Sequence, residues 1–165
     1  MRRRRSIPPP ESASRRYVGA MTTRDEIESF LDEYQAALSA YDAERSASLW
    51  GMPGTIVSDG FVGALHSRAE LAQALSQAYP FYQQLGLARV DHTLLEHVDL
   101  TASIARVHVR WHFYDDADEL LTDGDYEYLL RRDDDGPHAY VAVAIDEMEK
   151  LTKLAAEKGI QLPGT

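Results

Sequence analysis

The chain has 165 residues, the length of one domain with a substantial core, and ordinary hydrophobic and charged fractions for a globular protein. It contains no cysteine, which excludes a disulfide framework and thiolate chemistry. Outside the first 20 residues it has 11 basic and 26 acidic residues, a net charge of −15. An acidic body argues against a nucleic-acid partner, and no apolar run approaches the roughly 20 residues of a membrane span. We therefore expect a cytoplasmic protein without nucleic-acid or membrane partners.

Residues 1–22 form a separate region by composition. The first 20 residues carry six arginines and a single acid, and Pro8, Pro9 and Pro10 stop any helix. Because this stretch has little apolar surface to bury, we expect a disordered basic tail. The alternative is a basic arm that touches nucleic acid or anionic lipid.

The domain begins with helices. From Ile27 to Tyr41 apolar side chains recur at helical spacing, after a capping box formed by Thr23 and Glu26. Asp42 can cap a short second helix. The sequence therefore predicts two helices before residue 53.

A hairpin and a third helix follow. Asp59-Gly60 separates the apolar runs "TIVSDG" and "FVGAL", which is typical of a small hairpin. Ser67 and Glu70 form a second capping box and predict a helix that Pro80 kinks or ends.

From residue 88 onward the period of the apolar side chains changes from helical to alternating. In residues 104–113 alternate side chains are apolar, which indicates a long amphipathic strand. "DYEYLLRR" and "HAYVAVAI" predict two further strands, joined by the turn "DDDG". Acids on one strand then face Arg106 and Arg110 on its neighbour.

The strand predicted over residues 104–113 also bears on metal binding, because it contains two histidines. His108 and His112 have the spacing of a helical metal pair, but on a strand they lie about 13 Å apart. Two ligands of one zinc ion, each about 2 Å from it, cannot be that far apart. The acidic run at residues 115–119 lacks the order of a calcium loop. We expect no metal and no cofactor.

The chain ends in a further helix. Asp146 is the expected cap and Gly159 the expected stop, with Met148, Leu151 and Leu154 on one face. We expect residues 147–165 to form a helix and tail whose default role is packing. A lid or a dimer element is the alternative.

This order of elements resembles the nuclear transport factor 2-like (NTF2-like) superfamily, particularly its SnoaL-like proteins. The stretches "FLDEYQAALSAYDAERSASLW", "HSRAELAQAL", "VRWHFYD" and "YEYLLRRDDDG" carry the resemblance. It implies an α+β, cone-shaped fold over residues 23–146, in which N-terminal helices pack on a curved, mainly antiparallel sheet. It also implies a pocket inside the cone, where members with isomerase, dehydratase, cyclase or epoxide hydrolase activity place a carboxylate or histidine.

The apolar faces of the predicted elements supply the wall of such a pocket. We expect a small apolar or aromatic ligand to contact five aromatic side chains, Tyr34, Trp50, Trp111, Tyr126 and Tyr128. The ordinary alternative is that these rings fill the core and leave no space.

One predicted strand places polar groups on an apolar face. His92 and Glu96 share a face with Val90, Leu94 and Val98, and polar groups there need partners or solvent. They are the candidates for proton transfer, as a general base and its helper. A β-bulge is the alternative, because it would turn them outward.

Three functions fit these features. The first is a small-molecule-binding SnoaL-like protein with its pocket inside the cone. The second is a non-catalytic interaction module that dimerises through the outer sheet face, where Ile104 and Leu129 interrupt a charged ladder. The third is a cofactor-independent lyase, isomerase or hydrolase with an acid or base in the cone. A homodimer is expected in each case.

Overall fold

The computed structural model describes residues 23–162, so the predicted tail at residues 1–22 lies outside the described residues. Helices come first, then strands, then a last helix. The elements are α1 (Thr23–Ser39), α2 (Ala43–Ser48), β1 (Trp50–Ser58), β2 (Phe61–Leu65), α3 (Arg68–Gln84), β3 (Arg89–Asp99), β4 (Ile104–Tyr114), β5 (Leu120–Asp133), β6 (Gly136–Ala144) and α4 (Glu147–Lys158).

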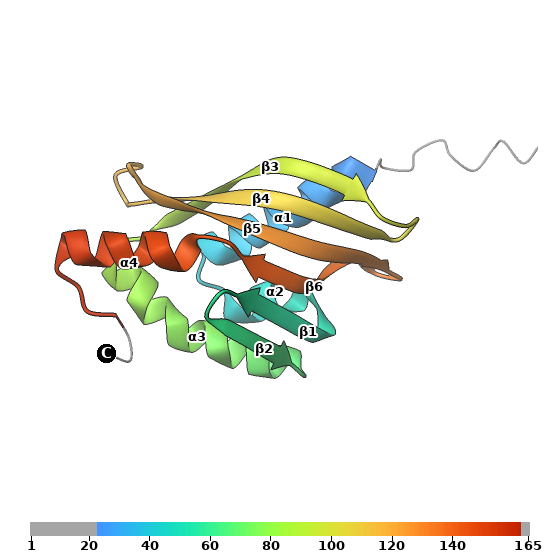
Figure 1. The fold of residues 1–165 in the computed structure, drawn as a ribbon, viewed down its shortest axis with the longest axis horizontal. Helices are drawn as coiled ribbons and strands as arrows, with labels where there is room; N and C mark the ends of the chain where they lie inside the picture. Colours follow the sequence, from blue (N-terminus) through green and yellow to red (C-terminus); the bar gives the residue numbers. More distant parts are fainter. Residues whose placement is uncertain (1–22, 163–165) are drawn as a thin grey trace, which may run out of the picture.

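The strands form one curved sheet in the order β2-β1-β6-β5-β4-β3. Neighbouring strands are antiparallel except β1 and β6, which are parallel. Helices α1, α2 and α3 lie along one side of this sheet, and α4 continues from β6 at one end (Figure 1). The predicted α+β fold, with N-terminal helices on a mainly antiparallel sheet and an extra C-terminal helix, is confirmed.

Several predicted boundaries are also confirmed. The side chain of Asp42 accepts a hydrogen bond from the Arg45 amide at the start of α2. Ser67 caps α3 by accepting from the Glu70 amide, and β1 and β2 pair across Asp59-Gly60.

Two helices differ from the prediction at their ends. Pro80 does not end α3, which continues to Gln84 with Pro80 exposed on the helix surface. Thr23 is already part of α1 and does not precede it, and Glu26 forms an ion pair with Arg132 at 2.7 Å.

The two faces of the sheet have opposite character. On β4 the side chains of Val107, Val109 and Trp111 are at most 2% exposed, whereas Arg106, His108, Arg110 and His112 alternate with them and are half-buried. We call the face of Trp111, which packs against the helices, the inner face, and the face of His108 the outer face. The predicted strand and its charged ladder are confirmed, since Arg110 pairs with Asp125 and Arg106 with Glu127 on β5.

Helix α4 is capped where predicted but turned differently. Asp146 is its N-cap, and Gly159 ends it with a φ of 69°. Leu151 and Leu154 are buried as expected, but Met148 is 66% exposed. Glu147 takes the place expected for Met148, because residues 147, 151 and 154 are spaced one and two helical turns apart and so share a face.

The cap of α3 gives a direct test of the local structure. Replacing Ser67 with alanine removes the acceptor for the Glu70 amide, so we expect the free energy of unfolding to fall by about 1 kcal/mol. Urea unfolding measures it, and Ser76→Ala, at an exposed position within the same helix, is the matched control. Equal stability of the two variants would show that the cap contributes nothing.

Candidate functional site

A cavity of about 170 Å³ lies inside the cone, between the helices and the inner face of the sheet. All five side chains predicted for its wall line it, namely Tyr34, Trp50, Trp111, Tyr126 and Tyr128. Apolar side chains from β1, α3, β3 and β4 complete most of the wall, and Tyr41, Tyr79 and Tyr82 add three more phenols. The aromatic side chains therefore leave space between them, and they do not close into a solid core.

Two of the phenols are each held by an indole. The Trp50 Nε1–H donates to the Tyr34 hydroxyl at 3.1 Å, and the Trp111 Nε1–H donates to the Tyr128 hydroxyl at 2.9 Å. An indole N–H can only donate, so each hydroxyl oxygen acts as the acceptor and keeps its own proton to donate. Burial raises the pKa of Tyr34 to about 12, and it raises that of Tyr128 well above its usual value. Both groups are neutral hydrogen-bond donors at physiological pH.

The cavity also contains one carboxyl group, that of Glu147, which the sequence analysis did not select. This residue is 7% exposed, and Tyr82 donates a hydrogen bond to its Oε1 at 3.2 Å. Burial raises the pKa of Glu147, and hydrogen bonds from Tyr126 and Tyr82 only partly oppose this effect. A carboxyl with a raised pKa can exchange protons closer to neutral pH than an ordinary glutamate can.

Space for Glu147 exists because of a glycine on β5. Gly124 pairs with Trp111, so its missing side chain would point to the inner face, in the same row as Tyr126 and Tyr128. A Cβ atom there would lie 3.0 Å from the Cβ and 3.3 Å from the Cα of Glu147. The first residue of α4 therefore lies directly over the strand and extends its side chain into the aromatic row.

His92 lies on the inner face but outside the cavity wall. Its Nδ1 contacts Gln35 Oε1 at 2.6 Å and its Nε2 contacts Glu28 Oε2 at 3.1 Å, both on α1. Its ring lies beside that of Trp111, with centroids 5.8 Å apart. These contacts join α1 to β3 and support the wall, and His92 is not among the residues that line the cavity.

His92 and Glu96 do not share a face, and the alternative of a β-bulge is confirmed for Glu96 but not for His92. The register of β3 against β4 shifts between Leu94 and Glu96, so that Leu94 pairs with Val109 but Glu96 pairs with His108. This β-bulge turns Glu96 to the outer face, where it lies 3.5 Å from Arg106. Glu96 is therefore outside the cone and cannot reach a molecule in the cavity.

Two groups in the described chain bring three possible metal-ligating side chains together, Glu96 with His108 and Glu127, and Asp133 with Asp135 and His138. Arg106 already pairs with both glutamates of the first group. In the second, Asp133 accepts from Tyr140 at 2.6 Å and contacts His138 at 3.0 Å. These side chains therefore have partners within the protein. His108 belongs to the first group, and His112 belongs to neither.

Comparison with known proteins assigns the family. The model of a family described as NTF2-like protein (DUF6841) matches residues 25–147. The chain belongs to this NTF2-like family. The match ends at Glu147, so the family region includes the carboxyl in the cavity. The resemblance to the NTF2-like superfamily is thereby confirmed.

Solved structures share this fold at low sequence identity. An NTF2-like protein of unknown function from Shewanella oneidensis is 20% identical with a TM-score of 0.62, over 76% of this chain and all of that one. A cystatin-like domain of unknown function from Nostoc punctiforme is 18% identical with a TM-score of 0.62, over 86% of this chain and 90% of that one. A ketosteroid isomerase-like protein from Erwinia carotovora atroseptica is 18% identical with a TM-score of 0.53, over 72% of this chain and 92% of that one.

No curated protein matches the chain significantly. Within residues 23–162, no helix has the length and apolar character that crossing a membrane requires.

The buried carboxyl predicts how stability changes with pH. Folded Glu147 holds its proton more tightly than the unfolded chain does, so its contribution to stability is present below its ordinary pKa of 4.5 and is lost as the pH rises through its folded value. Tyr82, Tyr126 and Asp146 are the other titratable groups around it. Glu147→Gln cannot lose a proton and so removes this loss. We therefore expect the melting temperature of the variant, relative to that of the native chain, to rise by a few degrees as the pH increases from about 4 to about 8.

The matched control is Glu149→Gln, because Glu149 is exposed on the same helix. This variant should not show the gain in melting temperature expected for Glu147→Gln. A pH-independent difference for Glu147→Gln would contradict the raised pKa.

Proposed function

We propose that this protein binds a small ring-shaped molecule in the cone and exchanges a proton with it through Glu147. The observation that carries the proposal is a buried carboxyl with a raised pKa in an otherwise aromatic and aliphatic cavity. Burying a carboxyl costs stability even when phenols donate hydrogen bonds to it, and titratable groups with shifted pKa values gather at functional sites.

The size of the cavity limits the ligand. An engineered protein cavity of roughly 150 Å³ holds one benzene molecule. The cavity here, at about 170 Å³, therefore suits one six-membered ring with one or two small substituents. Its aromatic wall favours an apolar ring, as expected for the predicted small apolar or aromatic ligand.

The two indole-held phenols suggest an oxygen on the ligand. Tyr34 and Tyr128 each have a hydroxyl proton that the indole contact leaves available, and their ring centroids lie 6.4 Å apart. A carbonyl oxygen can accept two such hydrogen bonds. A carboxylate on the ligand is disfavoured, because it would be buried beside Glu147. A neutral cyclic ketone or a related carbonyl compound fits best.

These groups together support proton transfer next to a carbonyl. Ionised Glu147 would remove a proton from the carbon beside the carbonyl, and the phenols would stabilise the negative charge that develops on the oxygen. Return of the proton to a different carbon makes an isomerase, and loss of a leaving group makes a lyase. Neither step needs a cofactor. The ketosteroid isomerase-like neighbour agrees with this class of reaction through its name, although its similarity extends to the fold alone.

A second proposal concerns the outer face, which we propose forms a symmetric homodimer. Leu129, Val141 and Val143 are half-buried apolar side chains on this face, beside the ladder of Arg106 and Glu127. Apolar side chains among complementary charges suit a self-complementary interface, in which the charges set the register.

Phenylalanine variants test the phenols. Tyr34→Phe and Tyr128→Phe keep the ring but remove the hydroxyl proton, so each should weaken the binding of cyclohexanone about fivefold. Ligand-observed NMR measures the affinity. Tyr140→Phe is the matched control, because its hydroxyl bonds to Asp133 and is not part of the cavity wall. Native affinity in both cavity variants, or no binding to the native protein, would contradict the proposed site.

Sedimentation velocity tests the dimer. We expect twice the monomer mass at micromolar concentration, and weaker association for Leu129→Glu because it buries a charge in the interface. Met148→Glu places the same charge on an exposed part of α4 and should leave the mass unchanged. A monomeric native protein would remove this proposal and leave the cavity proposal intact.

A further inference from the structure

The residue before Glu147 has an unusual role for a helix cap. Asp146 occupies the N-cap of α4, yet its side chain makes no capping hydrogen bond within that helix. A cap carboxylate ordinarily accepts from the first amides of its own helix. Here Oδ1 accepts from the Asp125 amide of β5 at 2.7 Å, and Oδ2 pairs with Lys150 at 3.1 Å. The side chain therefore joins the start of the helix to the sheet.

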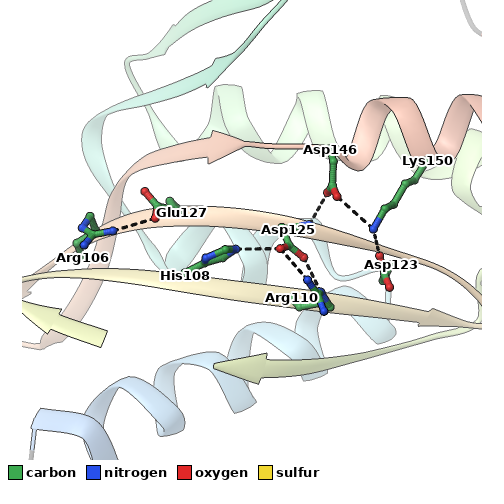
Figure 2. A network of polar contacts seen from close by, with 8 residues as sticks. All are labelled: Arg106, His108, Arg110, Asp123, Asp125, Glu127, Asp146 and Lys150. Atoms are coloured by element: carbon green, nitrogen blue, oxygen red, sulfur yellow. Dashed lines mark hydrogen bonds and ion pairs between the residues drawn. The ribbon is translucent and has the colours of Figure 1, made fainter. Parts of the chain in front are cut away.

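Asp125 holds this contact firmly because its own side chain is fixed. It is 7% exposed, and Arg110 binds both of its carboxylate oxygens at 2.7 and 3.1 Å. His108 contacts it at 2.9 Å, and Arg110 and His108 lower the pKa of the carboxyl. Lys150, which pairs with Asp146, also bonds to Asp123 on β5 (Figure 2). One charged network thus continues from the outer face to the first turn of α4.

The backbone completes the attachment. The Ile145 amide donates to the Asp125 carbonyl at 3.0 Å, so both backbone polar groups of Asp125 bind the segment that leads into α4. One position earlier on β5, Gly124 leaves the inner-face space that Glu147 fills. Adjacent residues of a strand point to opposite faces, so the Asp125 side chain is anchored on the outer face, its backbone binds the segment, and Gly124 admits the carboxyl inside.

We propose that Asp146 and Gly124 are positioning residues, and that the outer charged network fixes the carboxyl of Glu147 inside the cavity. Their importance for activity rests on the proposed function of Glu147. The outer network acts through the start of α4 and does not touch the ligand. It follows that changes on the outer face next to α4 alter the acid or base in the cone.

Two substitutions of Asp146 separate position from charge. Asp146→Asn and Asp146→Ala both remove its negative charge, but asparagine keeps an oxygen for the Asp125 amide. The readout is the pKa of the Glu147 carboxyl, followed by ¹³C NMR and assigned by loss of the signal in Glu147→Gln. The groups that face this carboxyl are Tyr82 on α3 and Tyr126 on β5, with Asp146 beside it and Tyr34 and Tyr128 further off.

With alanine, Glu147 should become more solvated, so its pKa should fall further toward the ordinary value than with asparagine. Equal pKa values of Glu147 in the two variants would overturn the proposal.

Gly124→Ala tests the same claim without touching a charge. The new methyl group would meet the Glu147 backbone at 3.3 Å, so the carboxyl must move and its pKa should change. Gly60→Ala is the matched control, because nothing lies within 4 Å of that position. An unchanged Glu147 pKa in Gly124→Ala would overturn the proposal even if Asp146→Ala fails to fold. Failure of the native protein to bind cyclohexanone would instead remove the proposed function, and the titration would still decide the positioning.

Discussion

The structure of the site depends on the burial of one carboxyl group against a glycine of the sheet. Glu147 begins α4, and its side chain occupies the inner-face position that Gly124 leaves open. The phenols of Tyr82 and Tyr126 surround it, and burial raises its pKa. Without this carboxyl the cone would enclose an aromatic cavity suited only to binding. With it, the same cavity contains an acid or base together with the phenolic donors of Tyr34 and Tyr128.

The two faces of β4 and β5 have different roles. The inner face carries Trp111 and Tyr128, whose hydrogen bond orients the phenol toward the cavity. The outer face carries Arg110 and Asp125. Their ion pair fixes β5 at the point where its backbone binds Asp146, the N-cap of α4. Strict alternation along the strands keeps charge outside and aromatic surface inside, and Glu147 enters the inner face from the helix that follows β6. The carboxyl therefore comes from the helix, and β5 contributes only the space that Gly124 leaves open.

The sequence was sufficient to predict the fold because its patterns are regular. The alternation around Trp111 identified β4, and the capping box at Ser67 identified α3. The five aromatic wall residues were found for the same reason, since each lies on an apolar face of a predicted element. Glu96 was misplaced because one extra residue in β3 reverses the alternation, and nothing in the sequence marks a bulge at Leu95.

Glu147 was missed for a different reason. An acid at the start of a helix ordinarily stays in solvent near the helix N-terminus, so it did not stand out as a site residue. One signal was available, because residues 147, 151 and 154 share a helical face and two of them are leucine. The glycine that admits Glu147 lies 23 residues earlier, in a strand, and only the tertiary structure brings Gly124 and Glu147 together.

The most direct measurement of the central claim is hydrogen exchange on a bound ketone. Cyclohexanone dissolved in D₂O with the protein should gain deuterium at the carbons beside its carbonyl, as observed by ¹H NMR, because Glu147 removes a proton and returns a deuteron. The exchange should exceed that in buffer and should disappear in Glu147→Gln, whereas Glu149→Gln should retain it. Exchange equal to that in buffer, or undiminished in Glu147→Gln, would contradict proton transfer by this carboxyl.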